Sequence, residues 1–475
     1  MRYNDVKFTH FGKKNGRTVL GNKKKSKVNG FIKNPHRALW KLSIPIMFGM
    51  SVQTIYSLVD MVFIGRLGGE AIAALGFTMP LLFFAIGITF GLGSGVTSVI
   101  SRFLGANAKK DADNSAEHGV LMGIVFGIIL SVVGYLLRYS IFEFLGATPE
   151  IIPLAVDYFS VIVLGFIFHI MNVFFRSILS GEGDTVTPIR FQITGTLLNM
   201  VLDPIFIFTL NMGIRGAALA TILSQFIVML FFLNYLFKRK QSYIHFRFSE
   251  FHFSFSLLKE IFRVGIPASM AMIIMSLGGM VFNRLLIRFG SEAVAAFGIA
   301  RNLDQIFFLP IMSMASGMVT LAGMFYGAGE YEKIRETWYY AIFRGIIIAI
   351  SIGFLFYLSA PDIYRIFSTE KEILKIAIQY TRLMVFVYPF IVISMISGRV
   401  FQGLGQGLPG LIITSLRVVF ISILFAVFFV LYLKKPLHYI WYSNMISSVS
   451  AGFLAFFWLR YRLHRLEESR SRLIM

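Results

Sequence analysis

The chain has 475 residues, of which 56% are hydrophobic and 15% are charged, and its formal net charge is +21. A soluble protein carries about 25% charged residues, so this composition excludes a soluble enzyme, and its apolar content excludes a disordered chain. The absence of cysteine excludes disulfides, thiolate metal sites and cysteine nucleophiles.

The apolar residues come in blocks of about 20, the length that crosses a bilayer core as an α-helix. The pattern therefore predicts an all-α integral membrane protein with twelve transmembrane helices. We expect a basic tail over residues 1–37, an N-lobe of six spans over 38–237, a linker over 238–261, a C-lobe of six spans over 262–460 and a tail over 461–475. The expected spans are 42–64, 76–100, 119–137, 154–179, 189–212, 216–237, 262–286, 299–325, 338–360, 377–398, 408–433 and 437–459.

The distribution of basic residues predicts the orientation of these spans. With the N-terminus inside, the inner segments hold 33 of the 45 Lys and Arg residues and the outer segments hold 12. This is the positive-inside pattern, and an even number of spans returns the C-terminus to the same side. We therefore expect a multi-pass plasma-membrane protein with cytoplasmic termini and no nucleic-acid partner. The lysines around residues 23–27 are interpreted as a solvated tail, with binding to anionic lipid as the alternative.

The chain also contains an internal repeat. At a shift of 222 residues it aligns with itself without gaps, and the matched positions include Ile44-Pro45 with Ile266-Pro267, Ser94-Gly95 with Ser316-Gly317, and Gly181 with Gly403. Because the shift preserves an even number of spans, the two six-helix lobes are expected to be related by an axis along the membrane normal. This pseudosymmetry is typical of a transporter with a central cleft. A symmetric channel or scaffold is the alternative.

The repeat acts as an internal control, because a group that only one lobe needs will be missing from the other. Asp60, Asn199 and Asp203 are polar in the first half and align with apolar residues in the second. At 1.5 Å per residue, Asp60, Asp203 and Thr221 all fall in the outer half of the bilayer, about 17, 14 and 5 residues into their spans. The aligned residues of the second half are Phe282, Ile421 and Phe425.

These side chains are predicted to form a cation-coupling site. Asn199 and Asp203 are four residues apart on one helix face, and Pro204 has no N–H for the carbonyl of Met200. With Thr221 they form an all-oxygen set suited to a proton or to Na⁺. An acid at mid-helix costs roughly 2.5–3.5 kcal/mol and must face protein or water. Two neighbouring carboxylates also repel, so at least one should exchange a proton near neutral pH.

Each of these residues has a structural alternative. Asp60 lies four residues before Ile64 at the end of its span, so its carboxylate is alternatively a group that reaches the outer interface. Asp203 is alternatively a structural hydrogen-bonding residue beside Pro204. Thr221 alternatively bonds its own helix backbone.

Further polar residues are candidates for the substrate cavity. Gln53 and Tyr56 precede Asp60 by seven and four residues and share its helix face. Tyr158 begins the fourth span at a similar depth, with an interfacial anchor as its alternative. Asn172 lies in the same span, with interhelical hydrogen bonding as its alternative. Pro45 predicts a bend in helix 1, or a point where one forms, although its repeat partner Pro267 makes an architectural role an equal alternative.

Enzyme motifs are missing from the sequence. It contains no phosphate-binding loop of the Walker type, and its eight histidines lack metal-site spacing. The glycine-rich run from Gly91 to Gly95 lies inside an apolar span, where close helix packing explains it better than phosphate binding. We therefore expect no enzymatic activity and no cofactor other than a coupling cation, H⁺ or Na⁺.

The chain resembles the MATE (multidrug and toxic compound extrusion) family over nearly all of residues 38–460. The motifs that carry the resemblance are Pro45, residues 53–60 (QTIYSLVD), residues 66–69 (RLGG), Gly105-Ala106, residues 181–185 (GEGDT) and residues 403–407 (GLGQG). It looks like the DinF-type branch, including archaeal members, in which the coupling site lies in the N-lobe. The NorM-type branch uses C-lobe carboxylates, where this chain has Phe282 and Phe425. Glu182 departs from the family, which more often has an apolar residue between the two glycines.

The resemblance implies an antiporter that exports small amphipathic, often cationic, compounds in exchange for H⁺ or Na⁺. We expect a monomer, although the sequence itself leaves the oligomeric state open. The coupling residues would be Asp60, Asn199, Asp203 and Thr221, and Gln53, Tyr56 and Tyr158 match cavity positions. Protonation of the two acids would bend helix 1 at Pro45. A flippase for lipid-linked precursors is the alternative. It would use cationic cavity residues to hold pyrophosphate, and the central thirds of the N-half spans contain no Lys or Arg.

Overall fold

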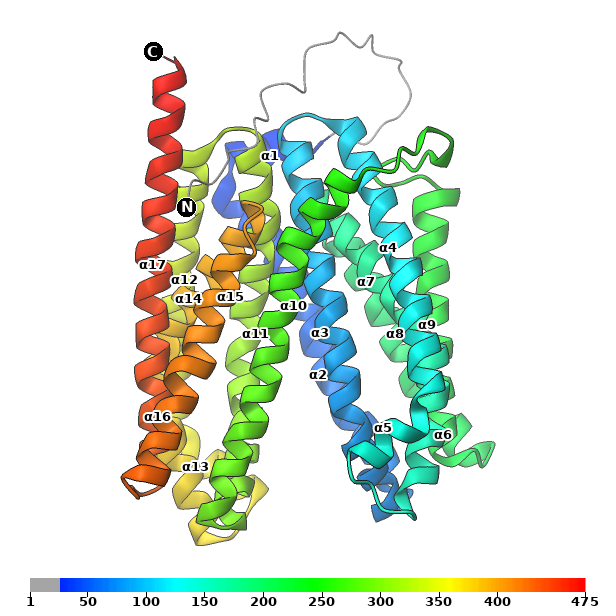
Figure 1. Cartoon of the computed structure of the whole chain (residues 1–475), viewed down its shortest axis with the longest axis vertical. Coiled ribbons are helices and arrows are strands. Elements are labelled where there is room, and N and C mark those ends of the chain that lie inside the picture. The colour runs from blue at the N-terminus through cyan, green and yellow to red at the C-terminus, as the bar shows by residue number, and fades with distance from the viewer. Residues whose placement is uncertain (1–25, 475) are drawn as a thin grey trace.

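The computed structural model describes residues 26–474, which form helices arranged in two lobes side by side (Figure 1). Eleven helices in this part of the chain are long and apolar enough to cross a membrane. The helices α6 (Ile151–Leu164) and α7 (Phe166–Gly181) meet at 45° and together supply a twelfth span. Helices satisfy their own backbone hydrogen bonds, which lipid cannot do for them. The predicted all-α membrane fold with twelve spans in two lobes is confirmed.

The N-lobe contains the helices from α2 to α9. A short helix, α1, precedes it, and the π-helical turns η2 and η3 follow its last two long helices. The remaining bounds are α1 (Val28–Lys33), α2 (Pro35–Gly65), α3 (Gly69–Gly105), α4 (Lys109–Leu136), α5 (Arg138–Phe144), α8 (Val186–Pro204), η2 (Ile205–Thr209), α9 (Gly213–Leu233) and η3 (Asn234–Lys238).

The C-lobe repeats this order, and several of its helices begin 222 positions after their partners. Thus α11 (Ser291–Gly327) corresponds to α3 at both ends, and α14 (Tyr388–Gly403) corresponds to α7 at both ends. The remaining elements are η4 (Phe248–Glu250), α10 (Phe255–Leu286), η5 (Ile287–Phe289), α12 (Tyr331–Phe367), α13 (Lys371–Met384), η6 (Val385–Val387), α15 (Leu408–Ser415), η7 (Leu416–Ile423), α16 (Leu424–Val427), η8 (Phe428–Tyr432) and α17 (His438–Ile474).

Helical structure extends into the segments expected as tails and linker. In the range 1–37, α1 begins at residue 28, and Lys27 donates to the carbonyl of Gly183 at 3.0 Å. The expected linker ends earlier than residue 261 because α10 starts at Phe255, and α17 continues through the expected tail 461–475 as far as Ile474. A 2.5 Å ion pair between Glu467 and Arg335 ties α17 to α12. The lysines at 23–25 lie outside the described residues.

The two lobes are joined at the end of the molecule where α1 and the C-terminal part of α17 lie (Figure 1). Ser98 of α3 donates to the carbonyl of Gln402 at 2.5 Å, and Thr320 of α11 donates to the carbonyl of Ser180 at 2.9 Å. These two bonds are repeat partners, because each donor and each acceptor is displaced by 222 positions. The lobes therefore meet through a pseudosymmetric pair of hydroxyl–carbonyl bonds.

Glycines allow the closest backbone approach at this joined end. A Cβ on Gly105 would overlap the carbonyl of Met324, and a Cβ on its repeat partner Gly327 would overlap the carbonyl of Arg102. Towards the other end the lobes separate. Gly87 of α3 still faces Met272 of α10, whereas Gly76 has no neighbour within 4 Å of its Cβ position. The molecule is thus closed at the joined end.

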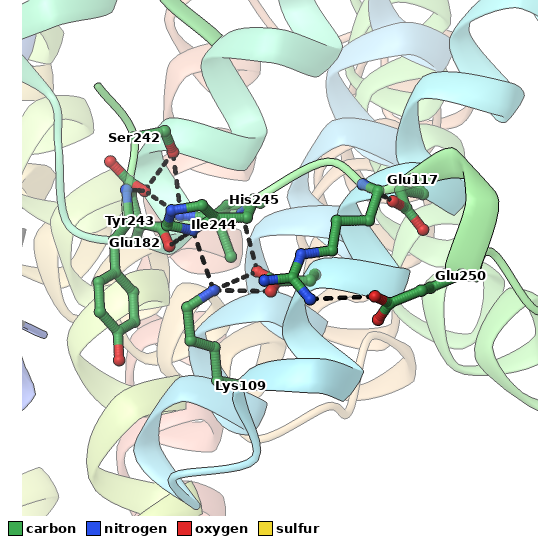
Figure 2. A network of polar contacts seen from close by, with 10 residues as sticks. Lys109, Glu117, Glu182, Ser242, Tyr243, Ile244, His245 and Glu250 are labelled. Atoms are coloured by element: carbon green, nitrogen blue, oxygen red, sulfur yellow. Dashed lines mark hydrogen bonds and ion pairs between the residues drawn. The ribbon is translucent and has the colours of Figure 1, made fainter. Parts of the chain in front are cut away.

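The linker between the lobes is held against the N-lobe by carboxylates (Figure 2). Glu182 Oε2 accepts from Ser242 Oγ at 2.5 Å and from the backbone N–H groups of Tyr243 and Ile244 at 2.7 and 3.1 Å. Farther along the linker, Asp113 accepts from the N–H of His245 at 3.0 Å and Glu117 from that of Arg247 at 2.6 Å. Burial, aided by the charges of Asp113 and Glu182, raises the pKa of Tyr243, so its phenol stays protonated.

Candidate cation-coupling site

A carboxylate and an amide lie on successive turns at the end of α8. Asn199 and Asp203 are both buried, and Asp203 is fully so, with 0% of its surface exposed. Their i, i+4 spacing brings the side chains together, and Asn199 Nδ2 donates to Asp203 Oδ1 at 2.7 Å. The predicted pairing of these two residues on one helix face is what the structure shows.

A tyrosine from α2 completes a hydrogen-bonded chain. The Tyr56 hydroxyl donates to Asn199 Oδ1 at 2.5 Å and also contacts the Thr221 hydroxyl on α9. The amide of Asn199 therefore connects Tyr56 on α2 to Asp203 on α8 through two hydrogen bonds. A change in the charge of Asp203 is coupled through this chain to α2.

Asp60 lies one helical turn beyond Tyr56 on α2 and is half-buried. Its charge acts on Asp203, on Tyr56 and on Tyr158 of α6. Tyr158 is buried, with 5% of its surface exposed. The three residues predicted from the asymmetry of the repeat, Asp60, Asn199 and Asp203, thus lie in one cluster inside the N-lobe, which tyrosines of α2 and α6 and a threonine of α9 complete.

One carboxylate oxygen of this cluster is buried without a hydrogen bond within the described part of the chain. Asp203 Oδ2 is buried and has no hydrogen-bond partner among the described residues. A buried ionised carboxylate with an unpaired oxygen is strongly disfavoured, so this atom calls for a proton or a cation. The other carboxylate that acts on it is Asp60.

The helix geometry changes directly after Asp203. Pro204 ends α8, and the chain continues as the π-helical turn η2, whose repeat partner in the C-lobe is η8. π-Turns are rare and often occur at functional sites. A π-helical turn occurs at this place in both lobes and therefore belongs to the repeated scaffold, whereas Asp203 aligns with Phe425 and is an addition of the N-lobe.

Two predicted residues adopt their structural alternatives. Thr221 Oγ1 donates to the carbonyl of Ala217 on its own helix at 3.0 Å. Asn172 of α7 is buried and donates through Nδ2 to the backbone oxygen and to Oε1 of Gln225 on α9, at 2.8 and 2.9 Å. Asn172 therefore serves helix packing within the lobe and does not join the other cavity candidates.

Gln53 leads to residues that the sequence analysis did not select. Its Oε1 accepts from Gln192 Nε2 of α8 at 3.4 Å, and Gln192 Oε1 in turn accepts from Arg176 of α7 at 3.3 Å. Comparison of the two halves could have identified Arg176, because the aligned residue of the second half is the uncharged Gly398. Pro45 lies in α2, which is helical without interruption from Pro35 to Gly65, so the bend at Pro45 stays a prediction.

The C-lobe carries an acid of its own that the comparison of Asp60 and Asp203 with their partners did not find. Asp304 of α11 accepts from the hydroxyls of Tyr380 and Tyr388 at 2.6 and 2.7 Å, so both of its oxygens are hydrogen-bonded. In contrast to Asp203, this carboxylate is already satisfied by neutral donors. It therefore has the character of a structural group.

Twelve spans in two repeat-related lobes, with a buried acidic cluster in one of them, define a two-lobed membrane transporter. The MatE family model matches the chain twice, over residues 45–205 and 267–428, and the two matches begin 222 positions apart. The chain belongs to this family of multidrug and toxic compound extrusion transporters, which confirms the resemblance found in the sequence.

Characterised relatives agree with this assignment. The chain is 28% identical over 451 residues to the multidrug export protein MepA of Staphylococcus haemolyticus, covering 92% of this chain and 96% of that one. Its fold matches a solved MOP superfamily transporter from Pyrococcus furiosus with a TM-score of 0.90 and 33% identity, covering 94% and 99% of the two chains. A multidrug resistance MATE transporter solved in an outward-facing conformation matches with a TM-score of 0.89 and 33% identity, covering 94% and 100%.

Proposed function

We propose that this protein is a secondary antiporter that exports amphipathic, mainly cationic, organic compounds in exchange for H⁺ or Na⁺. The observation that carries the proposal is the unpaired, buried Asp203 Oδ2, which shares the N-lobe cluster with Asp60. A carboxylate in this position is stable only with a proton or a cation, so it binds one on each cycle. The multidrug export named for MepA supports the substrate class.

The hydrogen bonds favour a proton over Na⁺. Asn199 turns its Nδ2 group towards Asp203 and its oxygen towards Tyr56. A sodium ion on Asp203 that took the Asn199 oxygen as a further ligand would require the amide to rotate and give up both bonds. A proton on Asp203 Oδ2 requires no such change.

Exchange of substrate for cation follows if each favours a different arrangement of the two lobes. A ligand shifts the equilibrium between two arrangements only by the difference in its affinity for them. Neutralising Asp203 leaves both hydrogen bonds of Asn199 in place but weakens the one that Asn199 donates, which loses its charged acceptor, and so acts through Tyr56 on α2, where Pro45 is the point for a bend. With the termini in the cytoplasm of a plasma-membrane protein, the joined end faces inwards. The arrangement is then open to the outside, as in the outward-facing relative.

Efflux from proteoliposomes under separately imposed H⁺ and Na⁺ gradients tests the proposal. We expect export of a fluorescent cationic dye to follow the H⁺ gradient in the wild type. Asp60→Asn and Asp203→Asn should each abolish gradient-driven export while the proteins still fold. Asp362→Asn, at an exposed acid, is the matched control and should transport normally. Wild-type export by either cluster variant would refute the assignment of the coupling site.

A flippase for lipid-linked precursors is the second candidate, favoured by one observation: Arg176 places a cation inside the N-lobe. Such an activity would move a pyrophosphate-bearing lipid between leaflets in the absence of any gradient of small amphiphiles. Reconstituted protein that scrambles such a lipid but exports no dye would favour this candidate over the antiporter.

A further inference from the structure

Arg176 is a half-buried cation that takes no part in the coupling cluster. It lies on α7 between residues 170 and 179, and all the other residues of that stretch are buried, whereas Arg176 retains accessible surface. In the described part of the chain, no carboxylate lies within 4.0 Å of its guanidinium group. An arginine within a membrane span normally pairs with an acid, so an unpaired one needs another explanation.

The accessible space beside Arg176 lies between the lobes. Its guanidinium group stacks over Phe90 of α3 at 4.6 Å, and the ring of Phe90 is 38% exposed. On α3, Gly91 faces Ser269 of the C-lobe and Gly93 faces Ser177 of α7. Successive helical residues differ by 100°, which puts Phe90 between these two faces. Arg176 therefore lies beside the part of the α3 surface between the face packed on the N-lobe and the face packed on the C-lobe.

Arg176 and the side-chain amides of Gln192 and Gln53 form a continuous polar strip. Arg176 donates to Gln192, and Gln192 donates to Gln53, so the strip crosses from α7 over α8 to α2. Gln53 precedes Asp60 by seven residues and Gln192 precedes Asn199 by seven, so the strip lies two helical turns, or about 10 Å, from the coupling cluster along both helices. The residues aligned with Arg176, Gln192 and Gln53 in the other half are Gly398, Thr414 and Met275. The strip, like the acids, is an addition of the N-lobe.

We propose that Arg176, oriented by Gln192 and Gln53, is an oxyanion-binding subsite for the transported compound. The guanidinium group offers parallel N–H donors that match a carboxylate, and the rigid stack on Phe90 reduces the entropy lost on binding. The preferred substrates are accordingly zwitterionic amphiphiles that carry an ammonium group and a carboxylate about 10 Å apart, with the ammonium group towards Asp60. This inference rests on the proposed export function.

The test compares one amphipathic dye that carries a trimethylammonium group and a carboxylate about 10 Å apart with its methyl ester, which keeps only the positive charge. In proteoliposomes with an imposed H⁺ gradient, the wild type should have a KM for the acid that is about tenfold lower than for the ester, as a charge-assisted hydrogen bond implies. Arg176→Gln should raise the KM of the acid to that of the ester. Arg190→Gln, at an exposed arginine of α8, is the matched control and should keep the difference.

Equal KM values for acid and ester in the wild type, or a preference that persists in Arg176→Gln, would overturn the subsite. Equilibrium dialysis of both dyes against the wild-type protein decides the question even where Arg176→Gln does not fold, because equal affinities exclude an oxyanion site. Arg176→Lys should restore part of the preference, since it keeps the charge without the planar fork. Failure of the wild type to export even the ester would count against the antiporter itself, whereas ester export without acid preference counts against the subsite alone.

Discussion

At the scale of single residues, the coupling cluster depends on how one amide is oriented. Asn199 accepts from Tyr56 and donates to Asp203, so its two polar atoms are committed in opposite directions. Reversal of the amide would place its N–H₂ group against Tyr56 and its oxygen against a carboxylate oxygen, which repel each other. Asp203 and Tyr56 together therefore set the orientation of the Asn199 amide.

Tyr56→Phe should slow transport with little effect on folding. The variant removes one neutral hydrogen bond, worth about 1 kcal/mol, and lets the Asn199 amide rotate away from Asp203. We expect H⁺-driven efflux to fall about three- to tenfold while the melting temperature of the purified protein changes little. Tyr432→Phe, at an exposed tyrosine, should transport like the wild type. An unchanged efflux rate in Tyr56→Phe would show that the Tyr56–Asn199 bond has no part in coupling.

The sequence predicts this cluster well and the neighbouring strip poorly, for a physical reason. Asp60 and Asp203 stand out because acids inside apolar spans are costly and their repeat partners are phenylalanines. Arg176 lies only five residues before the end of α7, so in a charge count it is indistinguishable from a loop cation. Only the side-chain contacts to Gln192 and Phe90 show that it points into the lobe.

At the scale of elements, the linker is shaped by acids that the C-lobe lacks. Glu182, Asp113 and Glu117 accept from linker backbone N–H groups, and their repeat partners are Leu404, Arg335 and Tyr339. The departure of Glu182 from the family pattern therefore has a structural role: it holds the start of the linker. A linker fixed to the N-lobe moves with that lobe and transmits its displacement to α10.

Glu182→Leu, which installs the residue found at the repeat position, should release the start of the linker. Hydrogen bonds to a charged group contribute about 1.5–3 kcal/mol, so we expect hydrogen exchange at the amides of Tyr243 and Ile244 to accelerate roughly ten- to hundredfold. Glu250→Gln removes an exposed ion pair with Arg247 and should leave these two amides unchanged. Equal protection of the amides in Glu182→Leu and the wild type would contradict the role assigned to Glu182.

The positions of the spans follow from the sequence, whereas their ends do not. Hydropathy marks the apolar part of each helix, but α2 begins at Pro35 and α17 runs to Ile474, because polar residues also form helix where they pair with a neighbour. The stack of His36 on Tyr340 at 3.9 Å and the pair of His464 with Glu468 at 3.2 Å are such contacts. The kink between α6 and α7 likewise depends on packing around Gly165, which no hydropathy pattern reveals.

At the scale of the whole molecule, the lobes are held together at one end by repeat-related contacts. The bonds from Ser98 and Thr320 and the close approach at Gly105 and Gly327 all lie there. These contacts must break if the molecule opens at this end during transport. The repeat relation between these contacts is suited to a joint that opens and closes as a unit.

Gly327→Ala should shift the molecule towards a form open at the joined end, because its Cβ would collide with the carbonyl of Arg102. The chain has no cysteine, so spin labels on Lys110→Cys and Glu332→Cys, two exposed repeat partners, report the separation of the lobes without background. We expect the distance distribution between these labels to lengthen in Gly327→Ala. Gly298→Ala, whose Cβ position has no neighbour within 4 Å, should leave it unchanged. A wild-type distribution in Gly327→Ala would argue against this joint.

The central claim is that substrate and cation compete through Asp60 and Asp203. The most direct measurement is proton release when a cationic substrate is added to the purified protein in weakly buffered solution. Linkage requires that a substrate which binds the deprotonated form displace protons, so the wild type should release about one proton per bound substrate and Asp203→Asn should release almost none. Substrate binding to the wild type without proton release, or equal release by Asp203→Asn, would contradict proton coupling at this cluster.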